Sequence, residues 1–244
     1  MQSKKYTLCS LLFETKENYS ENLKRVLSLV DNCSEDTLIV APEVCLTAYD
    51  YENFEAVLAF AKVATQAIKK ASYKKIIILT MIEKRDDGIF NFAKIFYNGE
   101  VVYERAKARL FRFGDEHKFM DEGSDEEFRI VEVNGIKIAI FICFELRFKE
   151  LWQKAEGADL IAIPAWWGVS RTEHYRALTQ TLAIVNQCYV VASDSLNAEC
   201  TKMSGIITPM GEESRNGNKP CLELPYKKKD ISLMRRYMDV GISG

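Results

Sequence analysis

Short apolar runs alternate along the chain with longer segments in which apolar residues recur every three or four positions. Short apolar runs are typical of strands, and the wider spacing is typical of one face of a helix. The predicted strands are Thr7–Phe13, Thr37–Ala41, Lys75–Ile82, Phe92–Tyr97, Val101–Glu104, Phe128–Val133, Ile136–Ile142, Asp159–Ile163, Tyr189–Ser193 and Gly205–Thr208. The predicted helices are Ser20–Asn32, Tyr51–Ala71, Glu145–Glu156, Arg171–Asn186 and Lys228–Tyr237. This order predicts an α/β fold.

Two connections carry the signal of a tight hairpin. Asn98-Gly99 and Asn134-Gly135 lie between apolar runs, and the Asn-Gly pair supplies the two positive φ angles of a type I′ turn. Continuous apolar runs such as Ile136–Ile142 indicate strands that are buried on both faces, so helices must cover the sheet. Because no repeat or Pro/Gly-rich linker interrupts the pattern, we expect one domain over residues 1–244.

The composition argues against several classes of protein. The net charge is −2 with both signs spread along the chain, which argues against nucleic-acid binding. No apolar stretch approaches the roughly 20 residues of a membrane helix, and the N-terminus does not resemble a signal peptide. We therefore expect a cytoplasmic protein without a membrane partner. The seven cysteines lack regular spacing and the two histidines, His117 and His174, lie far apart, so we predict no disulfide framework and no metal site.

Cys143 is the first candidate for chemistry, because it lies where a buried apolar run meets a predicted helix. The free N–H groups and partial positive charge at a helix start lower the pKa of a thiol and stabilise a developing oxyanion. The backbone N–H of Phe144 is the expected donor. The alternative is that Cys143 is a small core residue, as free cysteines commonly are.

Glu43 and Lys107 are the two other candidates. Glu43 follows the apolar run Leu38–Ala41 and Pro42, so a strand delivers its carboxylate to the edge of the sheet, where it could act as a general base. Lys107 follows the Asn98-Gly99 hairpin. The alternative for each is an ordinary charged residue that faces water.

Taken together, these segments resemble the nitrilase superfamily of carbon–nitrogen hydrolases, in which a glutamate, a lysine and a cysteine occur in this order. The stretches that carry the resemblance are Ala41–Glu43, Lys107–Phe111, Phe111–His117, Cys143–Phe148, Ile161–Trp167, Asn186–Val190 and Gly205–Glu212. Leu110–Arg112 and Asp115–His117 are most similar to the omega-amidase branch. The resemblance implies a four-layer α-β-β-α sandwich and a homodimer.

The resemblance also implies roles for the three candidates. Cys143 would attack an amide carbon to form a thioester, and Glu43 would move the protons of both half-reactions. Lys107 and the Phe144 N–H would stabilise the oxyanion. No cofactor or metal is needed for this chemistry.

Further residues are expected around the site. Glu116 or its neighbour Asp115 would hold Lys107 in place, and the sequence does not choose between them. Tyr49 and Trp167 are expected to wall the substrate pocket, with Phe144 as a third substrate contact.

The chain departs from the family pattern at several positions. Phe144-Glu145 replaces a Tyr-Asp pair after the cysteine, Arg109 replaces a histidine, and Ala48 replaces a glycine in the loop after Glu43. The last two changes are expected to reshape the entrance of the pocket.

The function predicted from the sequence is hydrolysis of a small amide, as in an omega-amidase, through a cysteine thioester. Within the same chemistry, an N-carbamoyl compound or a nitrile is the alternative substrate. An inactive binding or assembly module on the same fold is the alternative of a different class, and it would not need a thiol, a lysine and a glutamate together.

Overall fold

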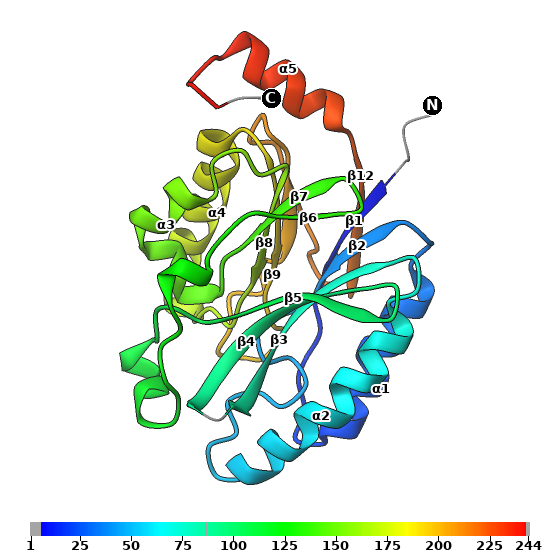
Figure 1. Cartoon of the computed structure of the whole chain (residues 1–244), viewed down its shortest axis with the longest axis vertical. Helices are drawn as coiled ribbons and strands as arrows, with labels where there is room; N and C mark the ends of the chain where they lie inside the picture. Colours follow the sequence, from blue (N-terminus) through cyan, green and yellow to red (C-terminus); the bar gives the residue numbers. More distant parts are fainter. Residues whose placement is uncertain (1–5, 86, 243–244) are drawn as a thin grey trace.

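The computed structural model of the protein describes residues 6–85 and 87–242, and it places two six-stranded sheets face to face (Figure 1). The first sheet has the order β12-β1-β2-β3-β4-β5. Its strands are β1 Tyr6–Leu11, β2 Thr37–Val40, β3 Ile76–Arg85, β4 Gly88–Tyr97, β5 Glu100–Ala106 and β12 Cys221–Tyr226. The second sheet has the order β11-β10-β9-β8-β7-β6. Its strands are β6 Val131–Val133, β7 Ile136–Ile140, β8 Leu160–Pro164, β9 Tyr189–Ser193, β10 Gly205–Ile207 and β11 Glu213–Arg215.

Helices cover the outer face of each sheet. α1 (Tyr19–Asn32) and α2 (Phe54–Ala71) pack on the first sheet, and α3 (Lys149–Lys154) and α4 (Thr172–Asn186) pack on the second (Figure 1). α5 (Lys228–Tyr237) follows β12. The predicted four-layer α-β-β-α sandwich is therefore confirmed. Among the described residues, no helix combines the length and apolar character needed to cross a bilayer.

Strands in the middle of this sandwich are apolar on both faces, which explains their continuous apolar sequences. In β2, Leu38 and Val40 belong to the core between the two sheets, whereas Ile39 faces α1 and α2. All three side chains are fully buried. A continuous apolar run is therefore the expected sequence of a strand that packs on helices with one face and on the other sheet with its second face.

The parallel strands of each sheet bring chemically active residues to one end of the sandwich. β1, β2 and β3 are parallel, and so are β7, β8 and β9. Glu43 follows β2 and Cys143 follows β7, so two facing sheets deliver the two residues. Polar groups beyond the carboxyl ends of such strands commonly form the binding crevice of an α/β protein.

Most predicted elements are present, and the differences have local causes. Both Asn-Gly turns have two positive φ angles, as predicted. The predicted strand Phe128–Val133 is shorter because Asp125–Glu127 forms a 3₁₀ turn. The predicted helix Glu145–Glu156 is confirmed only over α3, Lys149–Lys154, because Cys143–Arg147 forms a 3₁₀ helix and Phe148 is extended.

Two strands were missed by the sequence analysis. β11 has three residues, too few for a recognisable pattern, and β12 contains Glu223 and Pro225, which an edge strand tolerates but which interrupt an apolar run. β12 pairs antiparallel with β1 over its whole length. The end of the chain is thereby joined to its beginning.

Candidate active site

The structure brings Glu43, Lys107 and Glu116 into one buried ionic cluster. The Lys107 ammonium donates to the Glu43 carboxylate at 2.8 Å and to the Glu116 carboxylate at 2.8 Å. All three side chains are buried. These residues lie after β2, after β5 and in a 3₁₀ turn (Glu116–Lys118), so only the tertiary fold unites them. Asp115 instead pairs with Lys118 at 3.0 Å on the surface.

Lys107 remains a cation in this setting. Burial by itself would lower the pKa of the Lys107 ammonium, but the charges of Glu116 and Glu43 raise it above its ordinary value. The hydroxyl of Tyr49 lies 3.3 Å from the Lys107 Nζ atom. Burial and the same two carboxylates raise the pKa of Tyr49, so its hydroxyl stays neutral.

Glu43 is held by three donors of different kinds. Besides Lys107, the Asn91 side-chain amide donates to Glu43 Oε1 at 3.0 Å, and the Trp166 N–H donates to Oε2 at 3.1 Å. Burial raises the pKa of the Glu43 carboxyl, and Lys107 only partly offsets that effect. A carboxylate of raised pKa is suited to accept a proton near neutral pH.

Asn91 was missed by the sequence analysis. It lies in β4 between Phe90 and Phe92, and it is fully buried. An amide within an apolar strand is a signal that could have indicated it, because buried polar groups require partners.

Cys143 begins the 3₁₀ helix with a backbone φ of +44°, a left-handed value that is uncommon for a residue other than glycine. The pKa of its thiol is raised by burial first and by the charge of Glu43 second, while Lys107 lowers it. The expected lowering by a helix start is therefore wrong. A short 3₁₀ turn cannot offset burial next to a carboxylate, so the resting thiol is neutral.

A second ionic pair, Arg105 with Glu145, fixes the backbone around this cluster. The Glu145 carboxylate accepts from two Arg105 nitrogens and from the N–H groups of Ile142 and Ala108, both at 2.7 Å. Ile142 precedes Cys143, and Ala108 follows Lys107. Glu145 therefore ties the nucleophile turn to the lysine loop. In the sequence Glu145 stands out only as a departure from the family pattern, and nothing there indicates this role.

A pocket opens at Cys143. Its lining consists of aromatic side chains and two arginines together with the cysteine: Phe111, Cys143, Phe144, Arg147, Trp166, Trp167, Gly168 and Arg171. Phe144 and Trp167 thus lie where the sequence analysis expected them. Tyr49 is not in this lining; its ring packs edge-on against Trp166 at 6.4 Å, one layer behind the pocket.

The two arginines give the pocket a positive rim. The Arg147 guanidinium lies 4.9 Å from the Trp167 ring, and that of Arg171 lies 5.3 Å from the Phe111 ring. Burial and the charge of Arg171 lower the pKa of Arg147 below its ordinary value. The two guanidinium groups therefore repel each other, and an anion bound between them would relieve this repulsion.

Neither of the two departures expected to reshape the pocket entrance, Arg109 and Ala48, is in the lining of the pocket. Arg109 makes a two-point contact with Asp125, each bond 2.6 Å long, and it is absent from the pocket lining. Ala48 has a φ of +53°, a conformation in which glycine is easier to accommodate.

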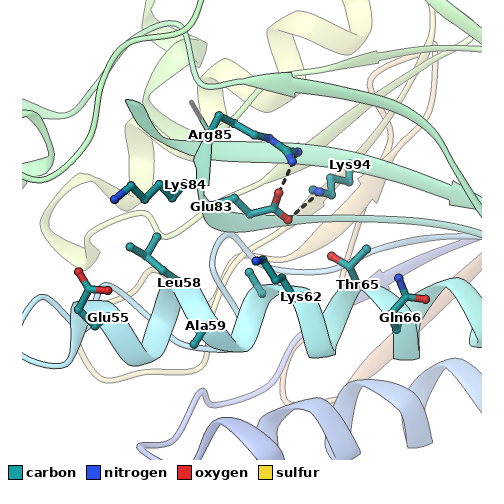
Figure 2. Close-up of a pocket in the computed structure, with 11 residues that line it drawn as sticks. Glu55, Leu58, Ala59, Lys62, Thr65, Gln66, Glu83, Lys84, Arg85 and Lys94 are labelled. Carbon is teal, nitrogen blue, oxygen red and sulfur yellow. Dashed lines mark ion pairs between the residues drawn. The ribbon is translucent and has the colours of Figure 1, made fainter. Parts of the chain in front are cut away.

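A wider groove of about 910 Å³ lies between α2 and the β3–β4 hairpin, away from Cys143. Figure 2 shows its charged wall, where Glu83 pairs with Arg85 at 2.9 Å and with Lys94 at 2.7 Å. These charges satisfy one another and no thiol lies among the lining residues. The candidate active site is therefore the smaller pocket at Cys143.

Comparisons with known proteins agree with this geometry. The carbon–nitrogen hydrolase family model matches residues 7–215. The chain is 28% identical over 228 residues to the 2-oxoglutaramate amidase of Bacillus subtilis, covering 88% of this chain and 87% of that protein. It is 28% identical over 197 residues to the omega-amidase YafV of Escherichia coli K12, covering 78% and 76%.

The fold has solved counterparts as well. Saccharomyces cerevisiae Nit3, a member of branch 10 of the nitrilase superfamily, superposes with a TM-score of 0.84 at 20% identity, covering 98% of this chain and 96% of that one. The family match, which extends over most of the chain and includes the buried glutamate, lysine and cysteine, shows that this protein belongs to the carbon–nitrogen hydrolases and is an amide hydrolase similar to the omega-amidases.

Proposed function

We propose that this protein hydrolyses the terminal amide of a small carboxylate-bearing substrate, such as the omega-amide of a 2-oxo acid, through a thioester on Cys143. The observation that carries the proposal is the lining of the pocket, in which Arg147 and Arg171 share one small space with Cys143. Guanidinium groups are the side chains best suited to bind a carboxylate at two points. The similarity to a 2-oxoglutaramate amidase supports the same substrate class.

In the first half-reaction, Glu43 accepts the thiol proton as the Cys143 sulfur attacks the amide carbon. The oxygen of the tetrahedral intermediate lies near Lys107 and the Phe144 N–H, which donate to it. Glu43 then gives the proton to the nitrogen, and ammonia leaves. The raised pKa values of both Glu43 and Cys143 support this order, because a neutral thiol needs a base.

In the second half-reaction, Glu43 takes a proton from a water molecule that attacks the thioester, and the sulfur leaves with that proton. Glu43 thus alternates between a charged and a neutral form. Glu116 keeps Lys107 protonated and in position while Glu43 is neutral, because its own 2.8 Å bond to Lys107 does not depend on Glu43. This second carboxylate is the reason we assign the supporting role to Glu116 and not to Asp115.

The pocket walls position the substrate. Phe144 packs on Phe111, with ring centroids 5.1 Å apart, and the Trp167 indole N–H donates to the Arg171 carbonyl at 2.9 Å. Trp167 thereby links the aromatic wall to the arginine rim. Tyr49 acts from behind the pocket, through Lys107.

We further infer a homodimer that uses the surface of α4. Three apolar side chains are exposed near the C-terminal end of this helix and on the adjacent loop: Ile184, Val185 and Met210. Gln180 donates to the Gly211 carbonyl, which holds the Met210 loop against α4. Exposed apolar clusters of this kind mark interaction surfaces. Light scattering should give a dimer mass for the native chain and a monomer mass for Val185→Glu.

The seven cysteines are free, which supports a reducing compartment such as the cytoplasm. Mass spectrometry of protein that is denatured and alkylated directly from cells, in the presence of a chelator, should find no disulfide among the seven cysteines.

The test of the main proposal is ammonia release from 2-oxoglutaramate, a neutral amide of matched length, an N-carbamoyl amino acid and a nitrile. Arg147→Gln and Arg171→Gln should each lower kcat/KM for 2-oxoglutaramate by roughly 100-fold, and hardly change it for the neutral amide. Cys143→Ala should abolish release from both. Equal loss with both amides would overturn the carboxylate assignment, and release from none of the compounds would favour an inactive binding module.

A further inference from the structure

Three cysteines outside the active site converge on a single point at the edge of the first sheet. The Cys9, Cys33 and Cys221 sulfur atoms and a Glu223 carboxylate oxygen all lie within 4.8 Å of one another. Cys9 lies in β1, Cys33 at the C-terminal end of α1, and Cys221 with Glu223 in β12. The three segments are far apart in sequence, so spacing alone could not reveal the cluster.

Strand register explains the convergence. Cys9 pairs directly with Glu223, and Cys221 lies two residues earlier in β12, so all three side chains project from the same face of the sheet. Cys9 belongs to the core cluster beneath α1. The final turn of that helix places the Cys33 thiol over this face, 3.8 Å from the Cys9 sulfur.

We propose that Cys9, Cys33, Cys221 and Glu223 form a binding site for a soft divalent metal ion of the Zn²⁺ class. Three sulfurs and one carboxylate oxygen are the number and kind of donors that tetrahedral zinc takes. Two sulfurs bound to one zinc ion lie about 3.8 Å apart, as follows from a Zn–S bond of about 2.3 Å. The Cys9–Cys33 pair already has this separation.

The other donors can complete the site with small movements. Sulfur–sulfur separations need to shorten by at most about 1 Å, and sulfur–oxygen separations by at most about 1.3 Å, to reach tetrahedral distances. Glu223 is exposed and Cys221 is half-buried on an edge strand, so an ion can reach the site from solvent. A disulfide would use only two of the four groups, whereas a metal ion uses all of them.

A bound ion would join β12 to both β1 and α1. It would thereby hold the edge strand β12 of the first sheet in place, and none of its four ligands lines the pocket at Cys143. Each thiol would give up its proton to the solvent as its sulfur binds the metal, so binding should weaken at acidic pH. This site does not depend on the proposed amidase function.

Cobalt(II) titration tests the site directly. The full chain carrying Cys143→Ala, reduced and freed of reductant and chelator, removes any contribution from the active-site thiol. One equivalent of Co²⁺ should produce a sulfur-to-cobalt charge-transfer band with the intense d–d bands of tetrahedral coordination. Zn²⁺ should displace the cobalt and raise Tm by about 5 °C at saturation.

Variants in the same Cys143→Ala background locate the ligands. Cys33→Ser and Cys221→Ser should each remove the charge-transfer band or weaken Co²⁺ binding at least 100-fold, and Glu223→Gln should weaken it by roughly 10-fold. Cys188→Ala is the matched control, because Cys188 is a fully buried cysteine in the other core cluster, and it should bind Co²⁺ unchanged. Circular dichroism checks that each variant is folded. Cys221 is half-buried, so its substitution should disturb the fold least.

Several results would overturn the proposal. The reduced protein could show no thiolate band with Co²⁺ and no rise in Tm with Zn²⁺. The band could survive in both Cys33→Ser and Cys221→Ser, which would place the metal elsewhere. A disulfide between two of the three cysteines after air oxidation, without metal binding by the reduced form, would identify the cluster as a redox pair instead.

Discussion

Two buried ionic groups lie side by side in this protein, and only one of them is suited to chemistry. Arg105 and Lys107 are two residues apart at the end of β5, and both are fully buried. Arg105 meets one carboxylate, Glu145, whose oxygens accept four hydrogen bonds. Lys107 meets two carboxylates, Glu43 and Glu116. The first group is neutral and its carboxylate is saturated with hydrogen bonds, whereas the second has one negative charge in excess.

This difference separates a structural pair from a catalytic one. A neutral ion pair whose carboxylate is already saturated with hydrogen bonds has no low-energy way to gain or lose a proton. A cluster with an extra carboxylate in a buried site can accept one, and the raised pKa of Glu43 expresses that capacity. Both groups are buried and have short ion-pair distances. They differ in their net charge and in whether the carboxylate is already saturated with hydrogen bonds.

The largest effect is expected for Glu43→Gln. This change removes the base while keeping the shape of the side chain, so kcat should fall about 1,000-fold with the fold intact. Steady-state ammonia release and circular dichroism measure the two quantities. A fall of less than tenfold would show that another group moves the proton.

Breaking the Arg105–Glu145 pair should instead lower the stability of the protein. Arg105→Met leaves the Glu145 charge buried and unpaired, and we expect the free energy of unfolding to fall by about 3–5 kcal/mol. Adding Glu145→Gln should recover much of this loss, because no charge is then buried alone. Urea denaturation measures both variants, and a loss below about 1 kcal/mol for Arg105→Met would contradict the comparison.

Glu116→Gln should be intermediate. Lys107 keeps Glu43 as a partner in the resting enzyme, so stability should change little. In this variant Glu43 is the remaining carboxylate partner of Lys107, and its charge is lost when Glu43 takes up a proton during the reaction. The kcat should therefore fall roughly 100-fold. Asp115→Asn is the matched control, since Asp115 is exposed, and its kcat should equal that of the native enzyme.

The pH dependence should reflect the raised pKa of Glu43. The acidic limb of kcat/KM should lie above the ordinary glutamate pKa of about 4.3, since Glu43 must be ionised to accept the thiol proton. The folded state binds this proton more tightly than the unfolded chain does. The resulting stabilisation is present below about pH 4.3 and is lost as the pH rises through the folded pKa. Glu43→Gln should therefore gain stability relative to the native protein between acidic and neutral pH, as urea titrations would show.

The smallest effect concerns backbone strain, which is found around the catalytic residues and not at Arg105. Val44, Ala48 and Cys143 have positive φ angles, whereas Arg105 lies in a regular strand. Ala48→Gly should stabilise the protein by about 1 kcal/mol, because glycine adopts this conformation without strain. Ala61→Gly, in the middle of α2, should instead destabilise it by about 1 kcal/mol. Thermal unfolding compares the two variants.

Local sequence patterns were sufficient for much of the fold. The order of strands and helices, both Asn-Gly hairpins and the layered architecture follow from runs and spacings that involve near neighbours in the chain. The pattern failed where a tertiary contact decided the backbone. The segment after Cys143 has a helical sequence, yet Glu145 is held by Arg105 and by the Ala108 N–H from the β5 end, and Cys143–Arg147 forms a short 3₁₀ helix.

The candidates for the chemistry could be chosen without coordinates, because Glu43, Lys107 and Cys143 lie in segments that carry a family resemblance. Their surroundings follow from the folded structure alone. It showed Glu116 as the second partner of Lys107, and it showed a thiol pKa that is raised by burial. It also brings together Arg147 and Arg171 at the pocket rim, and the four donors Cys9, Cys33, Cys221 and Glu223 from segments that are distant along the chain. Charge balance, burial and coordination depend on distances in space, and a linear pattern reports only distances along the chain.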